Sequence, residues 1–311
     1  MGMEQDICVD WSPVSKQEWD GYMQRAGYVA YQQHMAYAQT AQQFGAQSLQ
    51  AVMMRGGQAV GVVQLLVRRA LAVKMAIALR GPVWLGDVDD SCKAACYRAL
   101  KQTVPLRGMR FVLFMPEVDD HAALDQAQLK RVMTGHSTVL VDLQQDEEAL
   151  LAGMDGKWRN RLRAAQKSEL VVEPVSCRPA SYEWLLAKET EQASRIGYKA
   201  LATNLVPVYQ EYAGEDSLLI LQALHEGEVV GGVLMLLHGH SATYHIGWSS
   251  ELGKKLGAHN LLLWEAMRRL KASGTRWLDL GGVTTDPASA GLARFKLGLC
   301  SHLVALPGTY M

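Results

Sequence analysis

The fold of this 311-residue chain is decided most clearly by residues 276–310, RWLDLGGVTTDPASAGLARFKLGLCSHLVALPGTY. A β-rich run from Trp277 to Leu280 predicts a strand, and Gly281-Gly282 after it allows positive φ and close approach of another backbone or a ligand. Helical spacing from about Ser289 to Leu299 predicts a helix that carries Phe295-Lys296. This order of strand, polar loop, helix and last strand is typical of a catalytic edge.

The two halves of the chain repeat one plan. Each half has strands joined by a glycine-containing turn, then a long helix, then a further strand; the helices and last strands are expected at Ala94–Val104 with Arg110–Met115, and at Asn260–Ser273 with Arg276–Leu280. A strand that returns through a helix pairs parallel with its neighbour, which is the order of a GNAT-type unit. The predicted fold class is therefore α/β (α+β), with two tandem GNAT-like domains at 1–154 and 155–311. A strand at Ser137–Leu143 is expected to complete the first half.

Composition narrows the class of protein. Hydrophobic residues make up 49% of the chain, enough for a sizeable core, and 31 basic residues balance 31 acidic ones. Because the chain carries no net positive charge to attract nucleic acid, contact with RNA requires a local patch of basic residues. Apolar runs are too short to span a bilayer, and five cysteines without a CxxC pair fit a reducing compartment. We expect a cytoplasmic protein, self-sufficient as a monomer, with no metal site.

The ordered motifs of the second half resemble the Fem family of non-ribosomal peptidyltransferases. They are Leu278-Asp279-Leu280-Gly281-Gly282, Gly291-Leu292, Phe295-Lys296 before Gly298, and Gly308-x-Tyr310. The resemblance covers roughly residues 155–310 and is faint before them. It implies tandem GNAT domains that move an amino acid from aminoacyl-tRNA onto an amine, by default one on a peptidoglycan precursor. The long charged coiled-coil arm of some members is missing here, so the chain is similar to the compact ones.

The resemblance implies a catalytic role for Lys296. Attack of an amine on an ester passes through an oxyanion, which a fixed cation stabilises by about 3–4 kcal/mol. The family's functional lysine stands in the Phe-Lys pair, so Lys296 is the catalytic candidate, although a lysine is often simply solvated. Asp279 is a second candidate, to bind the incoming ammonium or orient Lys296, or else to cap the glycine turn. Arg294 is a candidate contact for the tRNA 3′ end, and Phe295 and Tyr310 are further substrate-binding candidates.

A basic helix between the halves offers further contacts. On a helix, Arg159, Arg163 and Lys167 lie one turn apart, opposite a face carrying Trp158 and other apolar residues. The resemblance places such a helix near the precursor or the tRNA phosphates, while the alternative is an ordinary solvated face. Further along, Arg195 and Tyr209 stand where similar proteins have an Arg and an aromatic facing the precursor.

Signature motifs for other chemistries are missing. No GxSxG, HExxH, P-loop or GxGxxG spacing occurs, which favours transfer without a cofactor. An acyl-CoA-dependent GNAT N-acyltransferase is the alternative, and it requires a glycine-rich turn that binds pyrophosphate at a helix N-terminus. The corresponding stretch, Lys254-Lys255-Leu256-Gly257-Ala258-His259, keeps only the central glycine. A bulky His259 there weakens the case for CoA. A third alternative is a degenerate GNAT pair that only binds a partner.

Overall fold

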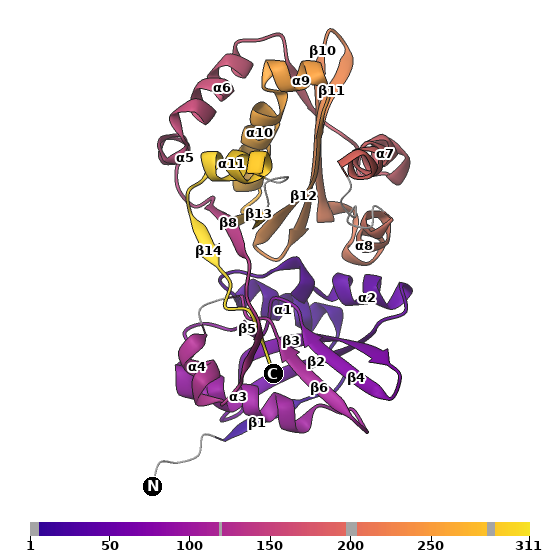
Figure 1. Ribbon diagram of the computed structural model, residues 1–311, viewed down its shortest axis with the longest axis vertical. Coiled ribbons are helices and arrows are strands. Elements are labelled where there is room, and N and C mark those ends of the chain that lie inside the picture. Colours follow the sequence, from indigo (N-terminus) through magenta and orange to yellow (C-terminus); the bar gives the residue numbers. More distant parts are fainter. Residues whose placement is uncertain (1–5, 118–119, 197–203, 285–289) are drawn as a thin grey trace. The chain divides into compact units, whose positions relative to one another are not determined.

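The computed structural model describes residues 6–117, 120–196, 204–284 and 290–311. The chain is a mixed α/β protein that forms two compact units: unit 1 comprises Met1–His136 with Ala305–Met311, and unit 2 comprises Ser137–Val304 (Figure 1). The division differs from the expected boundary at 154/155. Strand β8 (Ser137–Asp142) pairs antiparallel with β13 (Trp277–Val283), which ties it to unit 2, whereas the C-terminal strand β15 (Thr309–Tyr310) pairs within unit 1.

Unit 1 is built on one sheet. Its order is β1-β2-β3-β4-β6-β15-β7, with β5 also paired to β3. The strand bounds are β1 Ile7–Asp10, β2 Gln47–Arg55, β3 Gln58–Ala70, β4 Val73–Ala78, β5 Val83–Trp84, β6 Arg110–Phe114 and β7 Arg131–Met133. The glycine turn predicted between β2 and β3 is present, and β4 pairs parallel with β6, as the repeated plan predicts.

Helices pack on this sheet. They are α1 Lys16–Arg25, a 3-10 turn Tyr31–Gln33, α2 Met35–Gln43, α3 Asp90–Thr103 and α4 His121–Gln126. Helix α3 begins after Asp89, whose carboxylate accepts from Cys92 N, and it buries Tyr97 and Leu100 in the core. Cys92 and Cys96, one turn apart, are both fully buried on the same helix, as expected of core thiols. Helix α4 is short, and the chain pairs as β7 from Arg131.

Unit 2 repeats the arrangement around a second sheet, in the order β14-β8-β13-β12-β11-β10-β9. The remaining strands are β9 Val171–Pro174, β10 Leu218–His225, β11 Glu228–His238, β12 Ser241–Ser249 and β14 Leu303–Ala305. The helices are α5 Glu147–Gly153, α6 Gly156–Gln166, α7 Pro179–Ile196, α8 Leu205–Ala213, α9 Glu251–Leu256, α10 Ala258–Ala272 and α11 Ala290–Leu299, with a 3-10 turn Glu215–Ser217. Part of the polar loop expected before α11 falls on residues 285–289, outside the described residues.

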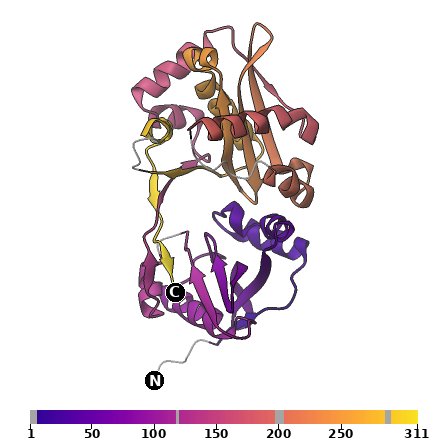
Figure 2. The same ribbon diagram turned by 45° about the vertical axis from the view of Figure 1, so that its right-hand side comes forward.

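Helices cover both faces of the second sheet. The adjacent glycines Gly231 and Gly232 show this, since a side chain on the first would meet Leu262 of α10 and one on the second would meet Trp184 of α7. Successive residues of a strand point to opposite faces, so α10 and α7 lie on opposite sides (Figures 1 and 2). The core between α10 and the sheet also takes Trp158 and Leu162 of α6. Among the helices of the described residues, none is long and apolar enough to span a membrane.

Candidate active site

Two parallel strands of unit 2 diverge and open the sheet. Strands β12 and β13 pair only from Ser241 with Trp277 to Thr243 with Asp279. Beyond that point β13 continues with β8, pairing Gly282 with Thr138 after an irregularity, while β12 continues along β11. The irregularity lies at Gly281, whose φ of +80° is a conformation that glycine adopts at little cost. The divergence leaves an opening between the two strands that side chains or a ligand can fill.

Asp279 stands where the strands separate and is fully buried. Its Oδ1 accepts a hydrogen bond from Thr138 Oγ1 at 2.5 Å and another from Gly281 N at 2.7 Å. The second bond is the capping of the glycine turn that was one of the two alternatives for this residue. Such bonds satisfy a buried carboxylate and fix the backbone that follows it.

Lys296 reaches the same turn from α11. Its side chain is only 7% exposed, and Nζ donates to Gly282 O at 3.0 Å. Nζ also lies 3.4 Å from the point that a Cβ on Gly281 would occupy. Burial lowers the pKa of the ammonium below that of an ordinary lysine, and the Asp279 carboxylate offsets part of the shift. Lys296 is thus a buried cation held at the end of β13, and its catalytic role stays a prediction.

Phe295 anchors α11 in the core of unit 2. Its ring centroid lies 5.8 Å from that of Trp158 on α6 and 5.4 Å from that of His259 at the start of α10. The first pair of rings is tilted and the second is edge-to-face, and aromatic rings prefer such arrangements to face-to-face stacking. Because Phe295 is locked by two elements, the next residue, Lys296, is directed toward β13.

A cavity of about 430 Å³ borders Phe295 and contains a hydrogen-bonded histidine. His259 Nε2 lies 2.9 Å from Tyr244 Oη, and Nδ1 lies 3.3 Å from Ser249 Oγ. One edge of the ring borders the cavity, yet enclosure by protein lowers the pKa of His259 to about 4, so the imidazole is neutral near pH 7. Arg161, Gln192 and Lys254 add polar groups to the lining.

Sequence reasoning treated His259 only as an obstacle to CoA and passed over Tyr244, Arg161 and Gln192. No local pattern indicates their contact, because Tyr244 lies on β12 and His259 in the first turn of α10, which begins at Ala258. Neither Lys296 nor Asp279 is among the described residues that line the 430 Å³ cavity. Lys296 instead adjoins it through its neighbour Phe295.

The turn that would hold a CoA pyrophosphate packs against α6 on one side. Gly257 has φ of +75° and separates α9 from α10. A Cβ on it would lie 3.2 Å from Arg161 Cγ, 3.3 Å from Arg161 O and 3.4 Å from Ala165 Cβ. The Arg161 guanidinium also donates to Lys254 O. Helix α6 therefore packs against one side of Gly257, while Gly253, Lys254 and Gly257 also line the 430 Å³ cavity.

The remaining predicted contacts are scattered. Arg159 Nη1 donates to Leu151 O at 3.0 Å and Ala152 O at 3.3 Å, so it caps the end of α5. Arg163 and Lys167 are exposed on and just after α6. The predicted stripe thus loses one member to a structural role, and two cations remain at the surface.

Four other candidates differ in their surroundings. Arg195 and Arg294 are exposed in unit 2, and Arg195 lines a small hollow of about 160 Å³ beside Trp248. Tyr209 is fully buried and its hydroxyl donates to Leu237 O at 3.4 Å, so it packs inside unit 2 and the predicted contact with a precursor loses its support. Tyr310 is a core residue of unit 1, with its hydroxyl 3.0 Å from His121 Nδ1.

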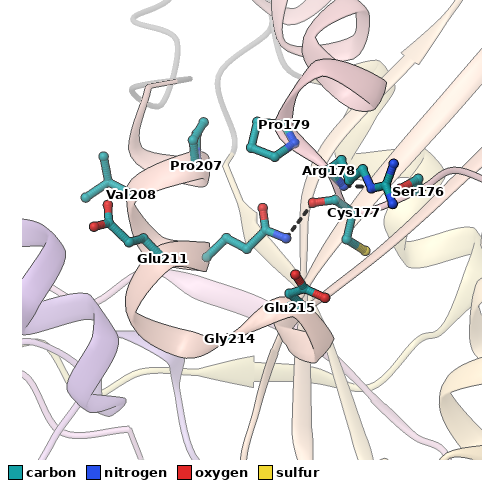
Figure 3. A pocket seen from close by; sticks show the side chains of 10 residues that line it. Ser176, Cys177, Arg178, Pro179, Pro207, Val208, Glu211, Gly214 and Glu215 are labelled. Carbon is teal, nitrogen blue, oxygen red and sulfur yellow. Dashed lines mark hydrogen bonds between the residues drawn. The ribbon is translucent and has the colours of Figure 1, made fainter.

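A larger hollow lies between the start of α7 and α8 (Figure 3). Its volume is about 790 Å³, and Gln210 Nε2 donates to Cys177 O at 2.6 Å on its wall. Burial raises the pKa of the Cys177 thiol, which disfavours a thiolate nucleophile. The described residues that line it include none from β13 or α11, so it is not part of the Lys296 region. No group of three or more metal-binding side chains occurs within the described ranges.

Comparison with solved structures identifies the fold. A crystal structure of FemX superimposes with a TM-score of 0.83 at 16% identity, covering 96% of each chain. The chain has the FemX fold. Residues 156–297 match the family model "Acetyltransferase (GNAT) domain", which agrees with the predicted acyltransferase class. The predicted tandem GNAT architecture is confirmed over the whole length, including the first half, where the sequence resemblance is faint.

Two more distant structures share the fold. One is the C-terminal domain of a putative lysylphosphatidylglycerol synthetase from Agrobacterium fabrum, with a TM-score of 0.52 and 15% identity over 80% of this chain and 79% of that one. The other is a tandem GNAT protein from the clavulanic acid biosynthesis pathway, with a TM-score of 0.50 and 12% identity over 98% and 96%. No curated protein matches the chain in sequence. At sequence identities of 12–16% these similarities show the fold alone.

Proposed function

We propose that this protein transfers an aminoacyl group from aminoacyl-tRNA to an amine of a peptide or cell-wall precursor. The observation that carries the proposal is the buried Lys296 ammonium, held on Gly282 O beside Asp279 at the open end of β13. A cation that is desolvated and held in place before reaction costs little reorganisation when negative charge develops next to it. The Fem resemblance of the Phe295-Lys296 pair and the FemX fold support the same chemistry.

The reaction needs no group beyond the two substrates. The neutral amine of the acceptor attacks the ester carbonyl carbon, a C–N bond forms, and the carbonyl electron pair moves onto oxygen. Lys296 stabilises that oxyanion. Collapse of the intermediate breaks the C–O bond to the ribose, and the ribose hydroxyl leaves with the proton that the attacking nitrogen gives up. The products are an amide and deacylated tRNA.

The cavity beside Phe295 suits the donor end. Tyr244, His259 and Phe295 offer aromatic surface and neutral hydrogen-bonding groups for a terminal nucleoside, and Arg161 and Lys254 place positive charge at its border. Aromatic stacking with flanking cations is the usual way to hold single-stranded nucleic acid. The neutral overall charge of the chain makes such a local patch necessary. A cytoplasmic location, where charged tRNA is present, is part of this proposal.

Acyl-CoA-dependent N-acyl transfer is the second candidate, and the GNAT family match over residues 156–297 favours it. Against it stands the sequence of the turn at 254–259, which keeps only the central glycine of a CoA-binding turn and has His259 at its last position. Binding of each donor separates the two functions. A rise in Tm with CoA and none with a stable, amide-linked aminoacyl-tRNA analogue would favour CoA, and the reverse would favour tRNA.

A chemical assay tests the transfer itself. Labelled aminoacyl-tRNA is incubated with the protein and peptides that carry a free side-chain amine, including cell-wall stem peptides, and the products are treated with mild alkali. An ester releases its label under these conditions, and an amide keeps it. We expect alkali-stable label on peptide with the wild type and with Lys101→Met, an exposed lysine of unit 1, and a large loss with Lys296→Met. Full activity of a folded Lys296→Met protein would remove Lys296 from the mechanism.

A further inference from the structure

Unit 1 contains a charged cavity that the proposed transfer does not use. Its volume is about 270 Å³, and its lining includes Tyr28, Arg80, Trp84, Lys93 and Glu117. All of these residues belong to unit 1. The cavity is therefore a feature of this unit alone and is independent of the function proposed for unit 2.

One wall is formed by an ion pair on strained backbone. Arg80 has φ of +53°, in the left-handed region that residues with a Cβ seldom adopt. Its guanidinium donates two hydrogen bonds to the Glu117 carboxylate, and Nη2 also donates to Tyr28 Oη at 3.2 Å. Arg80 and Glu117 are each 7% exposed. Strain and buried charge both oppose folding, and their concentration at a cavity wall is typical of a ligand site.

The facing wall is organised by a buried carboxylate. Asp120 is 1% exposed and accepts hydrogen bonds from Lys93 Nζ at 2.8 Å, Trp84 Nε1 at 2.8 Å and Tyr97 Oη at 2.6 Å. These bonds fix both the Lys93 ammonium and the Trp84 indole, with Nζ 5.6 Å from the ring centroid. Asp120 accepts one hydrogen bond from the ammonium, which has three N–H groups, and Lys93 itself lines the cavity, so the ammonium has further N–H groups with which to bind a ligand.

The lining thus combines two cations, Arg80 paired with Glu117 and Lys93 paired with Asp120, and two half-buried aromatic side chains, Tyr28 and Trp84. A fixed ammonium beside a fixed indole suits a ligand in which an anionic group is attached to a flat ring. We propose that this cavity binds a small aromatic anion, a carboxylate or a phosphate monoester, with Lys93 contacting the anion and Trp84 packing against the ring. The cavity is too small for a large ligand to enter whole.

Calorimetric titration of the full chain with benzoate and with phenyl phosphate tests the proposal. We expect saturable binding of at least one probe, and the tighter of the two identifies the anion. Lys93→Met should weaken it roughly tenfold or more, because a charge-assisted hydrogen bond is lost, whereas Lys101→Met, an exposed lysine of the same helix, should leave it unchanged. Circular dichroism monitors the fold of both variants.

A second comparison needs no variant. Benzyl alcohol matches benzoate in ring and size without the charge, so the wild type should bind it at least roughly tenfold more weakly than the better anion. Absence of saturable binding of both anions up to the order of 10 mM would overturn the proposal. Equal affinity for benzyl alcohol and the anions, or an equal loss of affinity in Lys93→Met and Lys101→Met, would overturn it as well.

Discussion

Replacing Lys296 with methionine removes the buried cation and keeps a side chain of similar length. Loss of one group that stabilises an oxyanion costs about 3–4 kcal/mol, so the turnover rate should fall roughly 100- to 1,000-fold. The stability of the fold should change far less, for two opposing reasons. The variant loses the hydrogen bond to Gly282 O, but it also removes a charge that burial disfavours, as the lowered pKa of Lys296 shows.

The lowered pKa of Lys296 also predicts how the stability of the protein changes with pH. The folded state lowers the pKa of Lys296, so between the folded and the unfolded pKa the unfolded chain binds more protons. Stability of the wild type should therefore rise with pH through that window relative to Lys296→Met, in which the contribution is absent. Thermal melts at several pH values measure this difference.

Single-turnover transfer from charged tRNA provides the activity assay, with Lys101→Met as the charge-matched control. A fall in rate with unchanged donor binding is the expected pattern, because the contact forms in the transition state. The reasoning would be refuted by a Lys296→Met protein that melts like the wild type and transfers within a fewfold of its rate. It would also be refuted by a variant whose whole defect lies in donor binding.

Three further predictions concern the same turn. Transfer should decline as pH rises through the lowered pKa of Lys296, giving an alkaline limb below that of an ordinary lysine in a pH–rate profile. Thr138→Val should cost about 1–3 kcal/mol in a denaturant titration, because it removes the hydroxyl that bonds to the buried Asp279 carboxylate, and an unchanged midpoint would contradict this. Gly281→Ala should cost about 1–2 kcal/mol at its φ of +80°, and an unchanged Tm would show that the turn relaxes.

The repeated order of elements was readable from the sequence because glycine turns and helical periods are local signals. Parallel pairing of β4 with β6 and of β12 with β13 followed from the helices between them. The boundary between units was not readable in this way. Strand β8 was expected to complete the first half yet pairs with β13 of unit 2, and β15 returns to unit 1. Both are long-range pairings that no local pattern encodes.

The candidate site was predictable only in part. The resemblance to the Fem family pointed to Phe295-Lys296, and in the structure Lys296 bonds to the backbone at the end of β13 while Phe295 packs against Trp158. His259 and Tyr244 are fifteen residues apart and meet only because α10 begins beside the diverging strand β12. Tyr209 was a candidate only because the resemblance gives similar proteins an aromatic facing the precursor, and no local pattern showed that helix α8 buries its side chain inside unit 2.

The identity of the donor is the claim on which the account depends. Wild-type protein and Lys296→Met are each incubated with labelled aminoacyl-tRNA, or separately with labelled acyl-CoA, and an amine-bearing peptide, and alkali-stable label on the peptide is counted. The account predicts label from aminoacyl-tRNA alone, strongly reduced by Lys296→Met. Label from acyl-CoA alone, at the same rate in both proteins, would contradict it.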